Sequence, residues 1–522
     1  MKRFFKLFLM CTAAALMTVS CTEKVTPDNG GGNQEDTRTE EEKANLKALK
    51  YLKNEIMDSY YYWYKDMREV SYSYKTDIFD YFDKILYKKD RWSWMMDGPT
   101  YVADESGVMY GTYGVSFGQL RDPANSQTTL DYHVMVRYVY PGSPFEAAGV
   151  QRGWILTKLQ GKYVVQEDPD NNDYWLSDNA NVQRFNEILN YPSTTIPCKF
   201  TFTDCDGNTH EVSVTAAESL NTRPCLTKMI FTAADYPGLT EPVGYFHYLG
   251  FKADDDINGK SMLNDITEPM AYFKEHNVKT LIVDLRYNGG GDSRASDLLV
   301  SYLAPVSARG KVYVTRTHNN KLSSEDKSQK IEEPLKIIED LESKYNVTFT
   351  AKPDSPEFKR LYFITGKGSA SASEMSLNGL KPLANVNHVG GVTYGKPNGM
   401  YVFMYPYTSK DRVAYERDDY SNLQYVFLPI CFFNKNGEGT DIPDDGMVPD
   451  NLRADDIYHD FGVNEDNIAA CLYHIVHGTY PAAPVYSTKA GRSKVEAKGV
   501  ELPNKEDYDK NYGRYTVIPD FL

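Results

Sequence analysis

One stretch, residues 361–383, constrains the fold of this chain more than any other. Leu361–Thr365 has the apolar pattern of a buried strand, and a Gly-Lys-Gly break ends it before a helical pattern begins. The spacing S-x-x-E predicts a capping box, with Ser371 at the helix N-cap and Glu374 three residues later. A serine there lies beside free backbone N–H groups at the positive end of the helix dipole, where a nucleophile and an oxyanion can both be held. The alternative is an ordinary strand–turn–helix unit whose serines only cap.

The composition bounds the class of protein. At 522 residues the chain is long enough for about two to four domains. Apolar residues make up 41% and charged residues 25%, which are the values of a globular protein. The formal net charge of −15 argues against nucleic acid as a partner, because phosphate binding requires a basic face.

The N-terminus has the pattern of a signal peptide, with basic residues, an apolar run and then small residues before Cys21. Thr18–Cys21 resembles a bacterial lipobox with threonine where leucine is usual. The sequence therefore predicts removal of residues 1–20, lipidation of Cys21 and a flexible tether over residues 21–39. We expect an exported bacterial lipoprotein anchored to the outer membrane, facing the periplasm or the cell surface. The five cysteines after Cys21 have no metal-ligand spacing and predict neither a metal site nor a disulfide framework.

Two regions precede the central stretch. Residues 40–100 are expected to form a small helical domain, and we interpret the aromatic cluster Tyr60–Tyr64 as part of its core. Residues 101–217 change to short strands and turns, among them a strand at Tyr132–Val139 and a turn and short helix at Pro141–Gly149. This order, centred on PGSPFEAAGVQRGWIL, resembles a PDZ domain.

The PDZ resemblance implies a peptide-binding loop. Backbone N–H groups of that loop would take a peptide C-terminus while the peptide adds a strand to the sheet edge. The alternative is a PDZ-shaped spacer that binds nothing. The loop falls on Tyr113, Gly114, Val115, Ser116 and Phe117.

Three further motifs are weaker. Ser116 satisfies the G-x-S-x-G elbow of α/β-hydrolase esterases, but a turn-rich polar stretch follows where that elbow requires a long helix. Ser324–Lys327 matches S-x-x-K within a charged run and lacks the companion motifs of penicillin-binding enzymes. The glycines at 289–291 lack the G-x-x-x-x-G-K-[ST] pattern of a phosphate cradle.

Residues 218–478 alternate strands and helices, which predicts an α/β fold, and residues 479–522 form a C-terminal tail. Thr280–Leu285 is a near-continuous apolar strand of the kind that parallel sheets bury, and a glycine loop follows it. Five pieces in this region, after a PDZ-like segment, together closely resemble the S41 family of serine peptidases, the carboxyl-terminal (tail-specific) processing proteases. The pieces are VGYFHYLGF, VDLRYNGGG, GSASASE, TYGK and GTDIPDDGMVPD.

The S41 resemblance implies a ClpP/crotonase-like catalytic core, hydrolysis of polypeptide substrates without a cofactor, and a Ser–Lys dyad. The nucleophile of the family is the middle of three alternating serines, here Ser371, and its general base follows after 25 residues, here Lys396. Many relatives have glycine and glutamine at the positions of Pro397 and Met400, so the third member of the site stays open.

The chemistry of a Ser–Lys pair makes definite demands on its surroundings. A serine hydroxyl needs a neighbour that accepts its proton, and lysine does so only as the neutral amine, with its pKa well below ~10.4. We expect burial of Lys396 against apolar neighbours, away from carboxylates, to lower its pKa. The oxyanion hole is expected from the N–H of Ala372 and that of Gly289 or Gly290.

The sequence thus favours a lipid-anchored serine endopeptidase whose PDZ-like domain selects substrates by their C-termini. An inactive descendant with the same sheet, or a non-catalytic peptide-binding lipoprotein, are the alternatives. The oligomeric state is not predicted.

Overall fold

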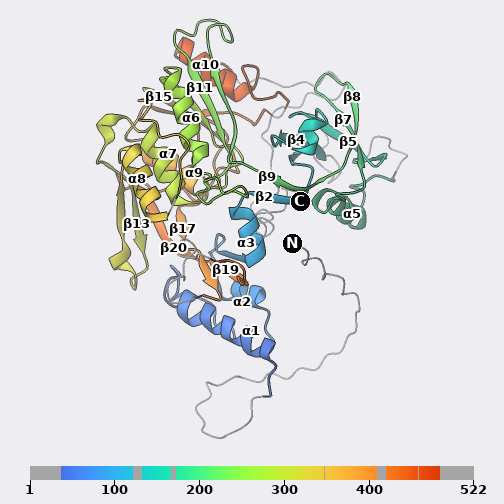
Figure 1. Cartoon of the computed structure of the whole chain (residues 1–522), viewed down its shortest axis with the longest axis vertical. Coiled ribbons are helices and arrows are strands. Elements are labelled where there is room, and N and C mark those ends of the chain that lie inside the picture. The colour runs from blue at the N-terminus through green and yellow to red at the C-terminus, as the bar shows by residue number, and fades with distance from the viewer. Residues whose placement is uncertain are drawn as a thin grey trace.

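The computed structural model describes residues 37–121, 132–165, 172–345, 347–407, 419–456 and 458–482. The expected signal peptide, Cys21 and most of the tether and tail lie outside these ranges. Figure 1 shows three regions: an α/β body, a β-rich unit beside it, and helices α1 and α2 at the far end of the long axis. In the part of the chain that is described, no helix combines the length and the apolar character needed to cross a membrane.

A mostly parallel sheet forms the centre of the α/β body. Its first strand is antiparallel to the second and the others run parallel, which confirms the parallel arrangement expected from the apolar strand after Thr280. The predicted strand at Leu361–Thr365 lies in the middle as β15. In order the strands are β10 (Cys225–Phe231), β11 (Val243–Tyr248), β12 (Thr280–Asp284), β15 (Arg360–Thr365), β16 (Val386–Gly390) and β21 (Asn451–Leu452).

Helices cover both faces of this sheet because side chains alternate along its strands. Leu361 and Phe363 pack in one core with helices on one face, while Tyr362 and Ile364 pack in a second core with α10 (Asp466–His477) on the other. The helices of the first face are α6 (Asn264–Glu275), α7 (Ser293–Leu303), α8 (Pro334–Tyr345) and α9 (Ala372–Leu380). Strand β15 therefore lies in the buried centre of the body, and the turn after it leads into α9.

Two smaller antiparallel sheets combine strands after β16 with strands from earlier in the chain. One packs against α9 and the other joins the N-terminal segment to residues 400–430. The first contains β14 (Lys327–Lys330), β13 (Val312–His318), β20 (Ile430–Asn436) and β17 (Asn398–Met400), and the second contains β1 (Trp94–Asp97), β19 (Tyr425–Leu428) and β18 (Phe403–Tyr405).

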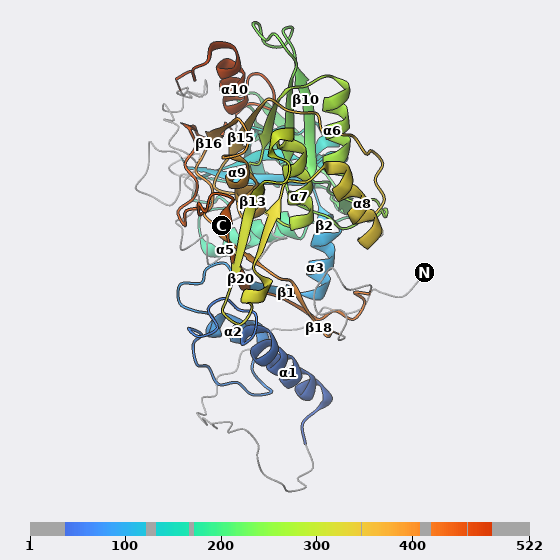
Figure 2. The ribbon, with the colours of Figure 1, turned by 90° about the vertical axis from the view of Figure 1, so that its left-hand side faces the viewer.

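The N-terminal segment contains the expected helices, namely α1 (Glu40–Lys50), which continues as a π-helix over Tyr51–Met57, and α2 (Ile78–Ile85), with α3 (Gly98–Glu105) following β1. Its apolar core is not self-contained. Phe403, Phe427 and Phe432 pack in the same cluster as the side chains of α1 and α2. The segment is therefore built into the rest of the molecule (Figure 2).

The β-rich unit (residues 115–214) is an antiparallel sheet flanked by two helices. Ser143 caps the short helix α4 (Pro144–Ala147), and its hydroxyl accepts the Glu146 N–H at 3.1 Å, as the sequence predicts. β2 (Val108–Thr112) and β9 (Ala217–Asn221) pair where the chain enters and leaves the unit. Its strands run in the order β3 (Val115–Arg121), β4 (Tyr132–Val139), β5 (Ile155–Leu159), β7 (Cys198–Thr203) and β8 (Thr209–Val214), with β6 (Lys162–Tyr163) on β5 and α5 (Asn179–Asn190) beside them.

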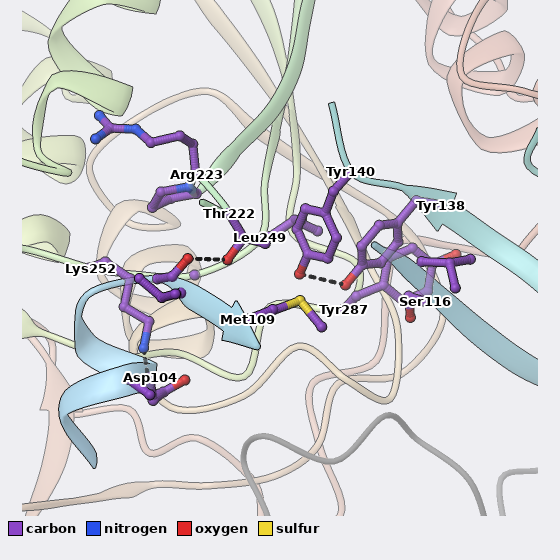
Figure 3. Close-up of a pocket in the computed structure, with 16 residues that line it drawn as sticks. Asp104, Met109, Ser116, Tyr138, Tyr140, Thr222, Arg223, Leu249, Lys252 and Tyr287 are labelled. Atoms are coloured by element: carbon purple, nitrogen blue, oxygen red, sulfur yellow. Dashed lines mark hydrogen bonds and ion pairs between the residues drawn. The ribbon is translucent and has the colours of Figure 1, made fainter. Parts of the chain in front are cut away.

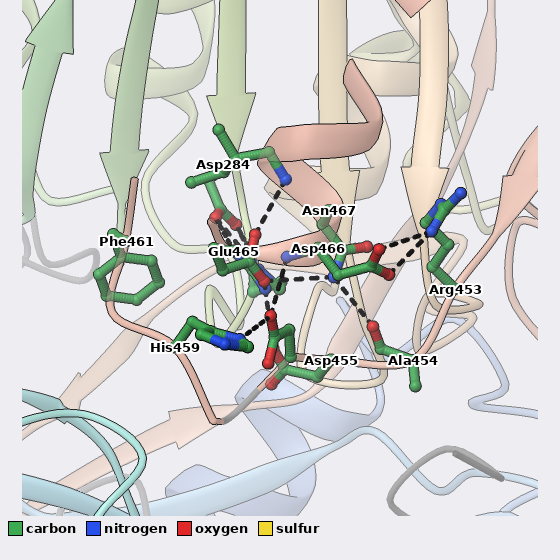
Figure 4. Close-up of polar contacts among 12 residues, drawn as sticks. Asp284, Arg453, Ala454, Asp455, His459, Phe461, Glu465, Asp466 and Asn467 are labelled. Atoms are coloured by element: carbon green, nitrogen blue, oxygen red, sulfur yellow. Dashed lines mark hydrogen bonds and ion pairs between the residues drawn. The ribbon is translucent and has the colours of Figure 1, made fainter. Parts of the chain in front are cut away.

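A buried ion network joins the main sheet, α10 and the β-rich unit (Figure 4). Arg286, only 1% exposed, pairs with Asp284 at 2.6 Å, Asp455 at 2.8 Å and Glu465 at 2.5 Å. Burial has the largest single effect and would raise the pKa of Asp284, but the charge of Arg286, that of His247 and the hydrogen bonds from Arg286 together lower that pKa to about 2. Arg152 of the β-rich unit extends the network, because it pairs with Asp455 at 2.9 Å.

We expect Arg286→Met to destabilise the protein by about 3–5 kcal/mol, because Asp284 and Glu465 would remain buried without their cation. Thermal unfolding followed by differential scanning fluorimetry measures the change. Lys199→Met, which breaks the exposed Lys199–Glu211 pair, is the control and should cost less than about 1 kcal/mol. Equal melting temperatures for the two variants would contradict a stabilising role for the network.

Candidate active site

Ser371 lies at the junction between the central strand and its helix. It is the N-cap residue of α9, and its N–H donates to the Glu374 carboxylate at 3.1 Å, which confirms the positions that the capping pattern predicts. Its backbone is at φ 54° and ψ −112°, a region that costs a non-glycine residue about 1–3 kcal/mol and occurs mostly at functional sites. A sharp strand-to-helix turn of this kind presents the serine side chain at the edge of the sheet.

The three alternating serines have different surroundings. Ser369 is fully buried, and its hydroxyl donates to the carbonyl of Leu285 at 2.7 Å. Ser373 is also buried and donates to the carbonyl of Asn288 at 2.9 Å. Ser371 is partly exposed. The two outer serines therefore fasten the turn to Leu285 and to the glycine loop that follows it, and the middle one is partly exposed.

The glycine loop (residues 286–291) touches Ser371 directly. A Cβ atom on Gly290 would lie 2.7 Å from the Ser371 Cβ and 2.9 Å from the Ala372 nitrogen, so only glycine fits there. The Gly290 N–H donates to the Asn288 side chain at 2.9 Å, while Gly289 is exposed. The sequence left two glycines open as oxyanion donors. Because the Gly290 N–H already donates to Asn288, Gly289 is the favoured donor.

The turn that carries Lys396 is fastened to α9 by Glu374. This fully buried carboxylate accepts hydrogen bonds from the Thr393 hydroxyl at 2.5 Å and from the N–H groups of Gly395 and Lys396, both at 2.8 Å. Because it also accepts the Ser371 N–H, one side chain holds both segments of the candidate site. The capping pattern identified Glu374 only as a local cap, and its contacts with the distant turn were missed.

The surroundings of Lys396 confirm one expectation and correct another. Burial lowers the pKa of Lys396 to about 8, whereas the carboxylates of Asp90 and Glu374 act in the opposite direction. The expectation that the amine is kept away from carboxylates is therefore wrong. With a pKa of about 8, roughly a tenth of the amine is neutral at pH 7. Burial has the opposite effect on an acid: it raises the pKa of Glu374, while the hydrogen bonds that this carboxylate accepts lower it.

The loop expected to bind a peptide C-terminus joins β2 to β3. Gly114 has a φ of 71°, and the Tyr113 ring packs on Phe145 with centroids 5.2 Å apart. Ser116 lies within strand β3 and not at a strand-to-helix turn, so the G-x-S-x-G elbow does not form. Cys21 lies outside the described residues. Among the residues that are described, no group of three His, Cys, Asp or Glu side chains is placed to hold a metal ion.

A cavity of about 270 Å³ lies beside this loop (Figure 3). Ser116, Tyr138 and Tyr287 lie together at one end of it, and Asp104, Arg223 and Lys252 lie at the other. The Tyr138 and Tyr287 rings lie 5.4 Å apart, and the Tyr287 hydroxyl donates to Asp455. The wall of the cavity thus includes residues of both segments that the sequence singled out, Ser116 of the expected peptide-binding loop and Tyr287 of the glycine loop.

Two family models match the chain. Residues 242–425 match peptidase family S41, and residues 54–94 match the peptidase S41 N-terminal domain. Among solved structures, a Bacteroides fragilis protein assigned to the S41 proteases aligns with a TM-score of 0.60 at 20% identity, over 82% of this chain and 97% of that one. The photosystem II D1 C-terminal processing protease aligns with a TM-score of 0.40 at 18% identity, over 80% and 93%.

We expect Glu374→Gln to loosen the Lys396 turn, because the amide would present N–H groups to backbone N–H donors. A buried donor that loses its acceptor costs about 1–3 kcal/mol. Hydrogen exchange followed by mass spectrometry should show at least a roughly tenfold faster exchange in a peptide covering residues 393–398. Glu339→Gln, on the exposed side of α8, is the control. Unchanged protection in Glu374→Gln would refute the role of this carboxylate.

Proposed function

Because this chain carries a peptidase family S41 domain, we propose that it is a serine endopeptidase that cleaves polypeptides with Ser371 as nucleophile and Lys396 as general base. The S41 match itself supports a peptidase function. The Ser–Lys pairing rests on one observation above all, the buried Glu374 carboxylate that binds the N–H groups of Ser371 and of Lys396. Two segments fastened to the same side chain are held in a fixed relation to each other.

The proposed reaction begins when the neutral Lys396 amine takes the proton of the Ser371 hydroxyl as its oxygen attacks the scissile carbonyl carbon. The N–H groups of Ala372 and Gly289 would donate to the oxyanion that forms, and loss of one such donor typically costs ~3 kcal/mol in barrier. Lys396 then protonates the leaving amine, which departs and leaves an acyl ester on Ser371. Water attacks this ester, Lys396 takes the proton of the water, and the new carboxyl terminus is released as Ser371 regains its hydrogen.

Lysine suits this role here because of its surroundings. With its pKa lowered to about 8 by burial, the amine is neutral in a useful fraction of molecules near neutral pH and still basic enough to accept the serine proton. The two other serines already donate to the carbonyls of Leu285 and Asn288, which leaves Ser371 as the favoured nucleophile.

We further propose that the β-rich unit is a PDZ-like domain that selects substrates by their C-termini. In the described part of the chain, β3 is the last strand of its sheet, and an extended peptide can add to such an edge while the Tyr113–Phe117 loop binds its carboxylate. Ser116 of this loop and Tyr287 of the glycine loop line the same cavity, which supports a link between peptide binding and the candidate site. The lipobox-like pattern at Cys21 supports the proposal that the enzyme is an exported, outer-membrane-anchored lipoprotein.

Replacing the nucleophile tests the proposal. We expect Ser371→Ala to lower the rate of peptide hydrolysis by roughly a thousandfold or more while peptide binding is kept. A fluorophosphonate probe should modify Ser371, as seen by mass spectrometry of the labelled chain. Ser116→Ala is the matched control and should retain labelling. Labelling at Ser116 would favour an esterase, and full function in Ser371→Ala would favour a peptide-binding protein without catalysis.

The pH dependence tests the base. Lys396 has a pKa of about 8, so at lower pH its amine is protonated and unable to accept a proton. We therefore expect kcat/KM to rise with pH through about 8 and then to level off. Lys396→Met should abolish this activity at every pH, whereas Lys367→Met, an exposed lysine in the loop before Ser371, should not change the profile. An inflection near 6.5 would instead point to a histidine.

A further inference from the structure

The Arg91 side chain of the N-terminal segment hydrogen-bonds to the Lys396 turn, close to Asp90, whose carboxylate also acts on the Lys396 amine. We propose that Arg91 is a positioning residue for the general base, so that residues 40–97 complete the active site. The inference rests on the proposed function, because it assumes that Lys396 accepts the serine proton. Neither the capping pattern nor the spacing of the dyad pointed to this residue.

Arg91 holds two backbone carbonyls at once. Its guanidinium donates from Nη2 to the Gly395 oxygen at 3.1 Å and to the Asp444 oxygen at 2.5 Å. The same group lies over the Trp92 ring at 4.6 Å and the Tyr394 ring at 5.7 Å, measured to the ring centroids. A planar guanidinium suits such a site, because it can donate to several acceptors and stack on aromatic rings at the same time.

The carbonyl that Arg91 holds belongs to the peptide bond that leads into Lys396. The Gly395 oxygen accepts from Arg91, and the Lys396 N–H at the other end of that bond donates to Glu374 at 2.8 Å. A planar peptide bonded at both ends is restrained against rotation, which holds in place the Lys396 nitrogen and Cα from which the side chain departs. Glu374 provides this restraint from α9, and Arg91 provides it from the N-terminal segment.

The turn has no freedom to shift toward the loop beneath it. Gly395 has a φ of 90°, and a Cβ atom there would lie 2.2 Å from the Asp444 oxygen. The Thr393 hydroxyl also accepts the Met447 N–H at 2.7 Å. Arg91 thus donates to two backbone segments that already contact each other. Loss of Arg91 would remove this restraint from both segments at once.

The residues on either side of Arg91 are held by hydrogen bonds. The preceding carboxylate, Asp90, accepts the Trp92 N–H at 2.9 Å and the Tyr61 hydroxyl at 2.7 Å. Trp94 begins strand β1, which pairs with β19, and the Ser93 hydroxyl accepts the Ile430 N–H at 2.8 Å. The guanidinium is therefore presented from a segment that is fixed to the same body as the turn.

The test compares Arg91→Met and Arg91→Lys with the wild type. We expect kcat and the rate of fluorophosphonate labelling at Ser371 to fall by about 10- to 100-fold in Arg91→Met, because small displacements of a catalytic group have effects of this size. KM should change by less than about threefold, since no substrate contact is removed. Arg91→Lys keeps the charge but not the planar guanidinium that lies over the Trp92 and Tyr394 rings, and should recover only part of kcat.

Tyr64→Phe is the matched control. It removes the bond from the Tyr64 hydroxyl to the Asn320 side chain at 2.8 Å, another contact of the N-terminal segment with the body but one that does not involve the turn. Wild-type kcat and labelling in this variant, beside the loss in Arg91→Met, support the inference. An equal loss in both variants would show that Arg91 acts only through general stability and would overturn it.

The two proposals fail in different ways. If Ser371→Ala is inactive but Arg91→Met and Arg91→Lys keep wild-type kcat and labelling rates, the role of Arg91 is refuted and the peptidase mechanism stands. If Ser371→Ala keeps full activity, the mechanism itself is refuted. Should Arg91→Met fail to fold, Arg91→Lys decides the matter, because wild-type kcat in that folded variant would overturn the need for the guanidinium.

Discussion

The whole candidate site depends on one buried negative charge. Placing the Glu374 carboxylate out of contact with water is costly, and the cost is offset only because four donors surround it. Two of these donors are the backbone N–H groups of Ser371 and Lys396, which lie in separate segments of the chain. A polar group that needs several partners to be tolerated thus also specifies how those segments meet.

The strand and the helix caps could be predicted from the sequence, because each is determined by residues close together in the chain. The strand at β15, the cap at Ser371 and the cap at Ser143 each depend on residues within a few positions, and each is confirmed. The likeness to S41 peptidases was predicted in the same way, from short pieces with fixed spacing, and the match over residues 242–425 confirms it.

The remainder depends on contacts between distant residues, which no local pattern encodes. Arg91 meets Gly395 across about three hundred residues, and β1 pairs with β19 over a similar separation. The expectation of an amine far from carboxylates was wrong for the same reason, because Asp90 arrives from the N-terminal segment. The expected helical domain shares its core with Phe403 and Phe427, which composition alone does not reveal.

The shared core has a consequence for how the chain folds. Helices α1 and α2 are synthesised well before residues 403–432, which supply side chains that cover their apolar faces. Contacts of such long range form slowly, since the intervening chain must be ordered before they bring any gain. We therefore expect α1 and α2 to reach their native packing late, and their aromatic side chains to stay exposed until residues 403–432 are in place.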